Sequence, residues 1–507
     1  HRGLHAARRK FVRVSLKELL LPGPERAFPA GWHDRLIKAA IHADDAQAFA
    51  HADAWLLAND IDHASLRDHR LLAEVAARFG PRLVGHAAYP RLVGLRRMLW
   101  TRSEMMLREA KPALSAIAGA GVQMLLLKGA ARLAQASPEA ENGRAERIVR
   151  DIDMAVRPKQ LPTAYDSLIE HGWRPAQGVS HHYVREHLAS MRGVGMIKGN
   201  LGDIELHPRL FHPGQGEAQD DAALWQRSHP VQLDNVEARL PSPEDGLALA
   251  IAHGGLNGHA DSDWLVDAAG ILSRHTLDWN RFAAIVEARS LQAPALFALA
   301  YLSAQAGLPV PAPVLANISQ AARAKPLAYL SASAQARPRE SATVIGNSIR
   351  GVAKLLRKRA ARRQARRAGD RWLTVRKVAQ ADTGAQSVPD LEQHVAVPPR
   401  LRGDRAHFHA VVQIAAPPGR RRIEFEVNAA DRHICRIRYR KWSNGARLLT
   451  LAIDGPIDIA PGETGLTLVS RPSRLLRHAG PREKARYDAL AFRCIVLEIT
   501  ENRDGRR

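Results

Sequence analysis

The chain has 507 residues, of which 46% are hydrophobic and 25% are charged. This balance is typical of globular proteins and excludes global disorder, and the length is sufficient for about two to four domains. The formal net charge is +23. Such a surplus favours polyanionic partners, namely RNA, nucleotides or an anionic membrane surface, and it carries no information about the fold.

Cysteine content and the N-terminal residues indicate a cellular compartment. Cys435 and Cys494 lie far apart in apolar alternating segments and form neither a zinc knuckle nor a disulfide framework. We therefore expect buried free thiols in a reducing compartment. The first residue is His1 rather than Met, so we expect the start to be trimmed or mis-called, and the residues after it lack the apolar stretch of a secretory signal. No apolar run approaches the roughly 20 residues that span a bilayer, so we expect a cytoplasmic protein.

In chain order, residues 12–118 are predicted to form a helical N-terminal region. Segments such as LRDHRLLAEVAARF place apolar side chains at three- and four-residue spacings. Within residues 119–240 the pattern changes to short apolar runs alternating with helical segments. The runs are VQMLLL, IVRDIDMAV and GDIELHPRLF; the segments between them are an Ala-rich stretch and LPTAYDSLIEHGW. Strand, helix, strand, helix and strand in succession predict a small mixed-sheet α/β core.

From Pro241 the chain is predicted to be helical again, and residues 241–325 are interpreted as a helical bundle that packs on the core. Ser242 is the expected N-cap of the first helix, with Asp245 at the capping-box position. Residues 400–502 contain six β-type runs separated by Pro, Gly, Asn and Asp, which predict an antiparallel β-sandwich. The predicted fold class is therefore α+β with several domains.

Positive charge is concentrated between residues 350 and 380, where twelve Lys or Arg stand against the single acid Asp370. We interpret the surrounding segment, residues 345–385, as a basic linker or exposed helix. Contact with RNA phosphates is the alternative. Trp372 alone offers an aromatic platform there, so base stacking has little support.

Acidic side chains in two of the predicted strands form a candidate catalytic metal site. Asp151 and Asp153 are two residues apart on a strand, so both project from the same face. Neighbouring carboxylates repel each other unless a cation lies between them, and hard oxygen ligands suit Mg²⁺. Glu205 in DIELH supplies a third carboxylate. We predict that the three residues hold two Mg²⁺ ions, with Mn²⁺ as an alternative.

Other polar residues are interpreted structurally. With 23 histidines in the chain, groupings such as His181, His182, His207, His253 and His259 are expected by chance rather than as a metal cluster. Asp267, in WLVDAAG, is predicted to be a buried helix acid with a basic partner. The sequence contains no Ser-His-Asp motif, P-loop or GxGxxG motif.

Taken together, LLLKGAARL at 125–133, DIDMAV at 151–156 and IELHPRLF at 204–211 resemble the uncharacterised bacterial nucleotidyltransferase family. That family is placed in the DNA polymerase β-like superfamily. The resemblance extends through PSPEDGLALAIAHGGLNGH and covers approximately residues 15–310. It implies that Asp151, Asp153 and Glu205 are the catalytic metal ligands.

The resemblance also implies a nucleotide-binding group, formed by Lys128, Gly129, Arg147 and His207. Gly129 would give a tight turn that lets backbone amides approach phosphate. Lys128 would neutralise phosphate charge, or would simply extend from a strand end into solvent. Arg147 would clamp the triphosphate, or would be an ordinary surface arginine. The resemblance also implies that His207 and His259 would line the pocket.

Three departures from the superfamily pattern concern the geometry of the nucleotide. The turn reads Lys-Gly-Ala where Gly-Ser is common, Arg150 stands where a small residue is usual, and the loop from Gly129 to Asp151 is long.

The predicted activity is metal-dependent transfer of a nucleoside monophosphate from an NTP to an acceptor, with release of pyrophosphate. The acceptor is left open among a small molecule, a protein hydroxyl and a tRNA end. The alternative is a catalytically inactive nucleotidyltransferase-fold protein that binds nucleotide, RNA or a partner. The intact carboxylates argue against this alternative, because a catalytically inactive site has no physical reason to keep three like charges together.

Overall fold

The structure is a computed structural model, and it describes only part of the chain. The described residues are 21–135, 148–176, 184–185, 188, 191, 193–211, 215, 218–338, 347–348, 350–352, 355, 372–377, 392–416, 421–429, 432–441, 447–471 and 492–501. Arg147, His181, His182 and most of the basic segment 350–380 lie outside them.

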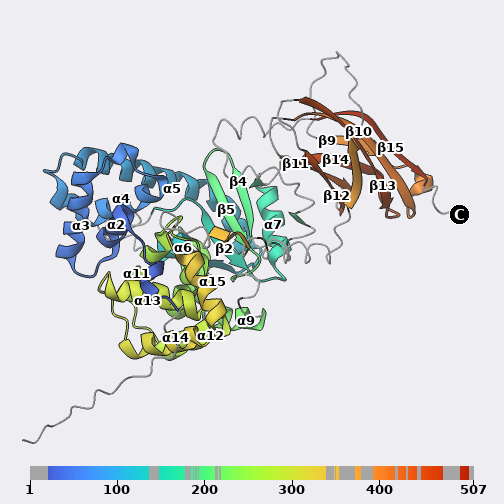
Figure 1. The fold of residues 1–507 in the computed structure, drawn as a ribbon. Helices are drawn as coiled ribbons and strands as arrows, with labels where there is room; N and C mark the ends of the chain where they lie inside the picture. Colours follow the sequence, from blue (N-terminus) through green and yellow to red (C-terminus); the bar gives the residue numbers. More distant parts are fainter. Residues whose placement is uncertain are drawn as a thin grey trace, which may run out of the picture. The chain divides into compact units, whose positions relative to one another are not determined.

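Two compact units divide the chain, and each is built from separate stretches of sequence. The first unit contains the described parts of 1–108, 124–155 and 209–357, and the second contains those of 109–123, 156–208 and 358–507. Figure 1 shows the helices and strands of both.

Helices dominate the first unit. Before the segment 120–211 they are η1 (Pro24–Ala27), α2 (Gly31–Ile41), α3 (Asp45–Ala58), η2 (Ile61–His63), α4 (Leu66–Phe79), η3 (Gly80–Leu83) and α5 (Tyr89–Gly119), which continues into the second unit. After it they are α9 (Ala218–Arg227), α10 (Pro243–Gly254), α11 (Asp263–Arg274), α12 (Trp279–Ala288), α13 (Gln292–Ala304), α14 (Ala312–Arg323) and α15 (Pro326–Ala336). Helices α2 to α4 and α10 to α15 bury their apolar side chains in one shared core. The helical character predicted for both stretches is confirmed.

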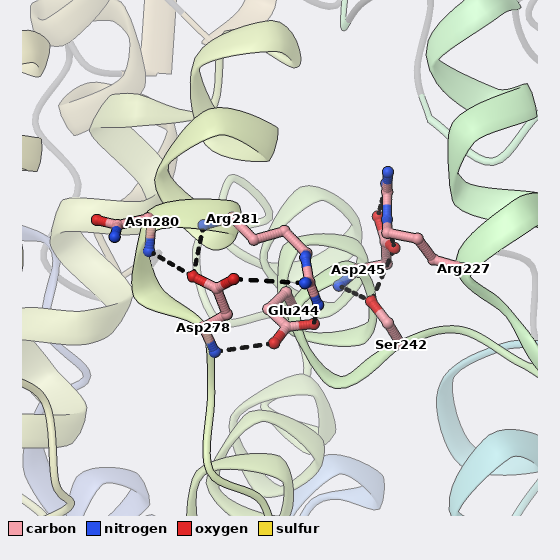
Figure 2. A network of polar contacts seen from close by, with 7 residues as sticks. All are labelled: Arg227, Ser242, Glu244, Asp245, Asp278, Asn280 and Arg281. Atoms are coloured by element: carbon pink, nitrogen blue, oxygen red, sulfur yellow. Dashed lines mark hydrogen bonds and ion pairs between the residues drawn. The ribbon is translucent and has the colours of Figure 1, made fainter.

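Polar side chains fix where α10 and α12 begin (Figure 2). Ser242 is the N-cap of α10, since its Oγ accepts a hydrogen bond from the backbone N–H of Asp245 at 3.2 Å. This confirms the predicted cap. The Asp245 carboxylate in turn accepts a bidentate pair of bonds from Arg227, both at 2.7 Å. One residue earlier, Glu244 accepts the backbone N–H of Asp278, which is itself the N-cap of α12.

A seven-stranded mixed sheet contains the strands that carry Asp153, Glu205 and His207. Its strands are β1 (Met124–Leu126), β2 (Ile152–Val156), β3 (Arg174–Pro175), β4 (Val194–Lys198), β5 (Gly202–His207), β6 (His229–Leu233) and β7 (Val236–Leu240), hydrogen-bonded in the order β3-β4-β5-β2-β1-β7-β6. β1 runs parallel to β7, whereas β4–β5 and β6–β7 are antiparallel hairpins. Helices α6 (Lys128–Gln135) and α7 (Leu161–Glu170) follow β1 and β2. The predicted alternation of strands and helices is confirmed, with β3, β4, β6 and β7 in addition.

The C-terminal β region belongs to the second unit. It contains β8 (Trp372–Lys377), β9 (Glu392–Ala396), β10 (Arg405–Ala416), β11 (Arg421–Ala429), β12 (Arg432–Lys441), β13 (Arg447–Asp458), β14 (Gly465–Arg471) and β15 (Phe492–Glu501). The strand order is β15-β10-β13-β8-β12-β11-β14-β9, and a single apolar core includes side chains from β10, β11, β13 and β14. Cys435 on β12 is a buried free thiol, as predicted; the side chain of Cys494 lies outside the described residues.

Strand β8 departs from the prediction for its segment. Trp372–Lys377 forms a strand inside the segment interpreted as a linker or helix. It pairs antiparallel with β13 but parallel with β12, whereas the strands within residues 400–502 pair with one another antiparallel, as predicted. The high charge of residues 345–385 favoured a linker or exposed helix. The short WLTV run within them, however, has the apolar and β-branched residues that a strand prefers.

In the described part of the chain, no helix combines the length and the apolar character needed to cross a bilayer.

Candidate metal site

The turn between β1 and α6 places a lysine beside a buried aspartate. Met124, Leu125 and Leu126 are buried, as expected for the central strand of a covered sheet. Lys128 then adopts a left-handed backbone conformation with φ of 49° and opens α6. Its Nζ lies 2.6 Å from Oδ1 of Asp153.

Gly129 has a different role from the one expected. The left-handed residue of the turn is Lys128, and Gly129 is a buried residue in the first turn of α6. The backbone N–H groups of this turn therefore belong to a helix N-terminus, where positive partial charge favours anions.

Asp153 lies in the middle of a fully buried strand. All five residues of β2 are buried, and the Asp153 side chain is 3% exposed. A buried carboxylate is costly unless a cation compensates it. Lys128 supplies one such charge from the first residue of α6.

Asp151 and Arg150 precede β2 rather than forming part of it. Asp151 is half-buried in a bend and Arg150 is exposed. Asp151 is directly adjacent to Ile152, the first residue of β2.

Strand β5 carries three polar side chains at alternate positions. Asp203, Glu205 and His207 share one face, and the intervening Ile204 and Leu206 are buried on the other. Glu205 Oε2 lies 3.6 Å from His207 Nε2, and the Glu205 side chain is 38% exposed. Asp203 is exposed at the start of the strand, so the row runs from solvent into the protein.

Gly193 lies immediately beside the Glu205 carboxylate. A Cβ at residue 193 would be 2.7 Å from Glu205 Oε1, well inside any normal contact. The absence of a side chain at Gly193 therefore leaves room for the carboxylate in its present position.

One group of described side chains has donor atoms close enough to hold a metal ion together. Asp153, Glu205 and His207 each offer one ligand atom, and these atoms lie within 4.8 Å of one another. Asp151 is not in this group. Two carboxylate oxygens and one imidazole nitrogen form a donor set that fits a divalent cation; the carboxylates favour Mg²⁺ or Mn²⁺, and the imidazole favours transition metals.

Helix α6 is anchored by a buried charge cluster. Arg132 lies between Glu74 of α4, at 3.6 Å, and Asp267 of α11, at 3.5 Å. The prediction that Asp267 is a buried acid with a basic partner is confirmed. Since Arg132 is four residues after Lys128, this cluster also restrains the helix that presents the lysine.

Two other histidines bond to the backbone. His253 Nε2 lies 2.9 Å from the carbonyl oxygen of Leu210, and His259 Nε2 lies 2.8 Å from that of Ala27. Neither belongs to the metal-ligand group, whereas His207 does, so the interpretation of these histidines as a chance grouping is wrong for His207.

A buried Ser-His-Asp arrangement was not foreseen. His33 Nδ1 lies 2.6 Å from Asp68 Oδ1, and His33 Nε2 lies 2.9 Å from Ser262 Oγ. Ser262 is fully buried, so a substrate has no access to its hydroxyl in this conformation. The arrangement links α2, α4 and the start of α11. Its members are up to 229 residues apart, and no sequence motif signals them.

Comparison with known proteins finds one family model that matches part of the chain. Residues 65–307 match the model of a family described as "Uncharacterised nucleotidyltransferase". No curated protein and no solved structure matches the chain significantly. The match contains Lys128, Asp153, Glu205 and His207, and it supports nucleotidyl transfer as the general activity of this segment.

Proposed function

We propose that this nucleotidyltransferase segment moves a nucleoside monophosphate from an NTP to an acceptor, with release of pyrophosphate, and that Asp153, Glu205 and His207 hold the divalent cation it requires. The observation that carries the proposal is the group formed by these three ligand atoms, all within 4.8 Å of one another. The donor set fits one cation; the second predicted ion would need a further ligand such as Asp151.

In this reaction the acceptor oxygen attacks the α-phosphorus, and the bond from that phosphorus to the pyrophosphate oxygen breaks. A bound divalent cation supplies Lewis acidity to the phosphates. Lys128, fixed beside Asp153, lowers the cost of keeping that carboxylate ionised in a buried strand. The first turn of α6 offers backbone N–H groups for phosphate oxygens.

The proton of the acceptor hydroxyl needs a base. Glu205 is our candidate, because its side chain is more exposed than that of Asp153 and an acceptor can approach it. Arg147 remains our candidate for contact with the triphosphate. We leave the acceptor as a small molecule, a protein hydroxyl or a tRNA end.

The test is transfer of label from each α-labelled NTP into a cell extract with Mg²⁺ or Mn²⁺. The parent protein should label an acceptor, and Asp153→Asn should abolish the labelling. Asp203→Asn is the matched control, because Asp203 shares the strand face of Glu205 but lies outside the ligand group. It should label as the parent does.

One result of the labelling experiment would contradict the proposal. Equal labelling by the parent and Asp153→Asn would exclude a catalytic role for Asp153 and favour a binding protein with an inactive site. Binding of Mn²⁺, followed by electron paramagnetic resonance, should be lost in Asp153→Asn and retained in Asp203→Asn. The opposite pattern would exclude the proposed ligand set.

A further inference from the structure

A cavity in the N-terminal helices combines an aromatic surface with positive charge. It measures about 370 Å³ and is lined by Gly31, Trp32, Asp34, Arg35, Lys38 and His51, from α2 and α3. It shares no residue with the group of Asp153, Glu205 and His207. A volume of this size is at the lower end of that typical for small-ligand sites.

Trp32 supplies a partly open aromatic ring. Its side chain is 45% exposed, although tryptophan is normally buried. The guanidinium carbon of Arg35 lies 5.4 Å from the centroid of the Trp32 ring. An aromatic surface and a fixed positive charge therefore lie next to each other on the first turns of α2.

The positive charges of the cavity exceed its negative charge. The acid Asp34 is already engaged by Lys38 Nζ at 2.8 Å and by the Tyr301 hydroxyl at 2.7 Å. Among the described residues, neither Arg35 nor His51 makes a hydrogen bond or ion pair. The Arg35 guanidinium donors and the His51 imidazole are thus available to a ligand.

The surroundings of His51 indicate positive potential in the cavity. Burial lowers the pKa of the His51 imidazole, and the charges of Lys38 and Arg35 lower it further. His42 acts in the same direction, and Asp34 opposes it. An anion placed here would relieve this repulsion.

We propose that this cavity binds one nucleotide unit, with the base against Trp32 and the phosphate beside Arg35 and His51. Stacking on an exposed aromatic side chain next to cationic groups is the general physical basis of sequence-tolerant nucleotide binding. The inference does not depend on the transfer reaction. The nucleotide unit comes either from a free mononucleotide or from single-stranded RNA, and the experiment separates these sources.

The experiment measures binding by the full-length protein in isothermal titration calorimetry. The probes are AMP, UMP, adenosine, inorganic phosphate and a short single-stranded RNA. Arg35→Gln and Trp32→Leu should each weaken binding by about tenfold, from loss of a charge-assisted bond and of a stacking contact respectively. Raising the salt concentration should weaken binding of the RNA.

The chain offers a matched pair of controls on α5. Arg97 and Trp100 are also an exposed Arg and Trp three residues apart, but they do not line the cavity. Arg97→Gln and Trp100→Leu should leave binding unchanged. Arg35→Gln and Trp32→Leu should leave the transfer of label from NTP unchanged, because neither residue belongs to the metal-ligand group, so loss of transfer activity and loss of this site are distinguishable.

A second readout is the NMR titration of His51. Bound AMP should raise the His51 pKa in the parent protein, because the phosphate charge favours the imidazolium.

The calorimetric probes identify the source of the nucleotide unit. Binding of RNA but not of AMP assigns the site to a nucleic-acid strand, and binding of AMP assigns it to free nucleotides.

Three results would overturn the proposal. The first is the absence of binding by any nucleotide probe, and the second is equal loss of binding in the α5 controls. The third is inorganic phosphate binding as tightly as AMP with no effect of Trp32→Leu.

Discussion

At the scale of single residues, the position of the Glu205 carboxylate depends on the absence of a Cβ at Gly193. Gly193→Ala would place a Cβ 2.7 Å from Glu205 Oε1, so the flexible carboxylate must move while its charge remains. We expect the affinity for Mn²⁺ to fall by about tenfold, as for other changes that displace a metal ligand. Isothermal titration calorimetry with Mn²⁺ measures this.

Gly85→Ala is the control for that substitution, because a Cβ there meets nothing within 4 Å. It should leave the Mn²⁺ affinity unchanged. Unaltered Mn²⁺ affinity in Gly193→Ala would contradict the role of Gly193 in placing the Glu205 carboxylate.

A substitution of Lys128 measures how much this lysine stabilises the buried Asp153 carboxylate. Lys128→Met leaves the Asp153 carboxylate without its lysine partner in a buried strand. The free energy of unfolding should fall by about 2 kcal/mol, less than for a fully buried pair because Lys128 is partly exposed. Urea denaturation checks this value, and added Mg²⁺ should recover part of the loss in Lys128→Met.

The double variant separates charge from packing. Asp153→Asn in the Lys128→Met background should cost less than Asp153→Asn alone, because the two side chains interact directly. Strictly additive losses would mean that the 2.6 Å contact carries no coupling energy.

At the scale of elements, helix α10 depends on its first turn. Ser242 accepts the N–H of Asp245 and donates its hydroxyl to the Asp245 carboxylate at 2.8 Å, as Figure 2 shows. Ser242→Ala should lower the free energy of unfolding by about 1 kcal/mol, the usual cost of losing an N-cap. Ser242→Asn keeps a capping oxygen and should cost less, and chemical denaturation distinguishes the two variants. Equal losses would contradict the capping role.

At the scale of the whole molecule, helices distant in sequence are joined by the buried His33–Asp68–Ser262 chain. Burial raises the pKa of the Asp68 carboxyl, but hydrogen bonds from His33 and Ser65 outweigh it and hold that pKa below its ordinary value of 3.8. A depressed pKa in the folded state stabilises the protein above the unfolded-state pKa, and this contribution is lost as the pH falls through the lower folded-state value.

Asp68→Asn should therefore lower the free energy of unfolding by about 2 kcal/mol at neutral pH. The difference from the parent should shrink as the pH falls below 3.8, where the unfolded-state carboxyl becomes protonated. Urea denaturation of both proteins across this range measures the trend. A difference that is constant with pH would contradict an ionised Asp68 in the folded protein.

The sequence alone determined the local elements and the chemistry of the site. Helical spacing, the Ser242 cap and the succession of β1, α6, β2, α7 and β5 follow from near neighbours in the chain, whose periodicity and capping residues act locally. The same is true of Asp153 and Glu205 as acids within apolar strands.

Tertiary structure alone decided which side chains meet. The left-handed conformation at Lys128, the bend that removes Asp151 from β2, and the space beside Gly193 depend on segments that pack from elsewhere in the chain. So do the parallel pairing of β8 with β12 and the partners of His33, which lie 35 and 229 residues away. Local periodicity carries no information about such contacts, because their energy comes from groups that are close only after folding.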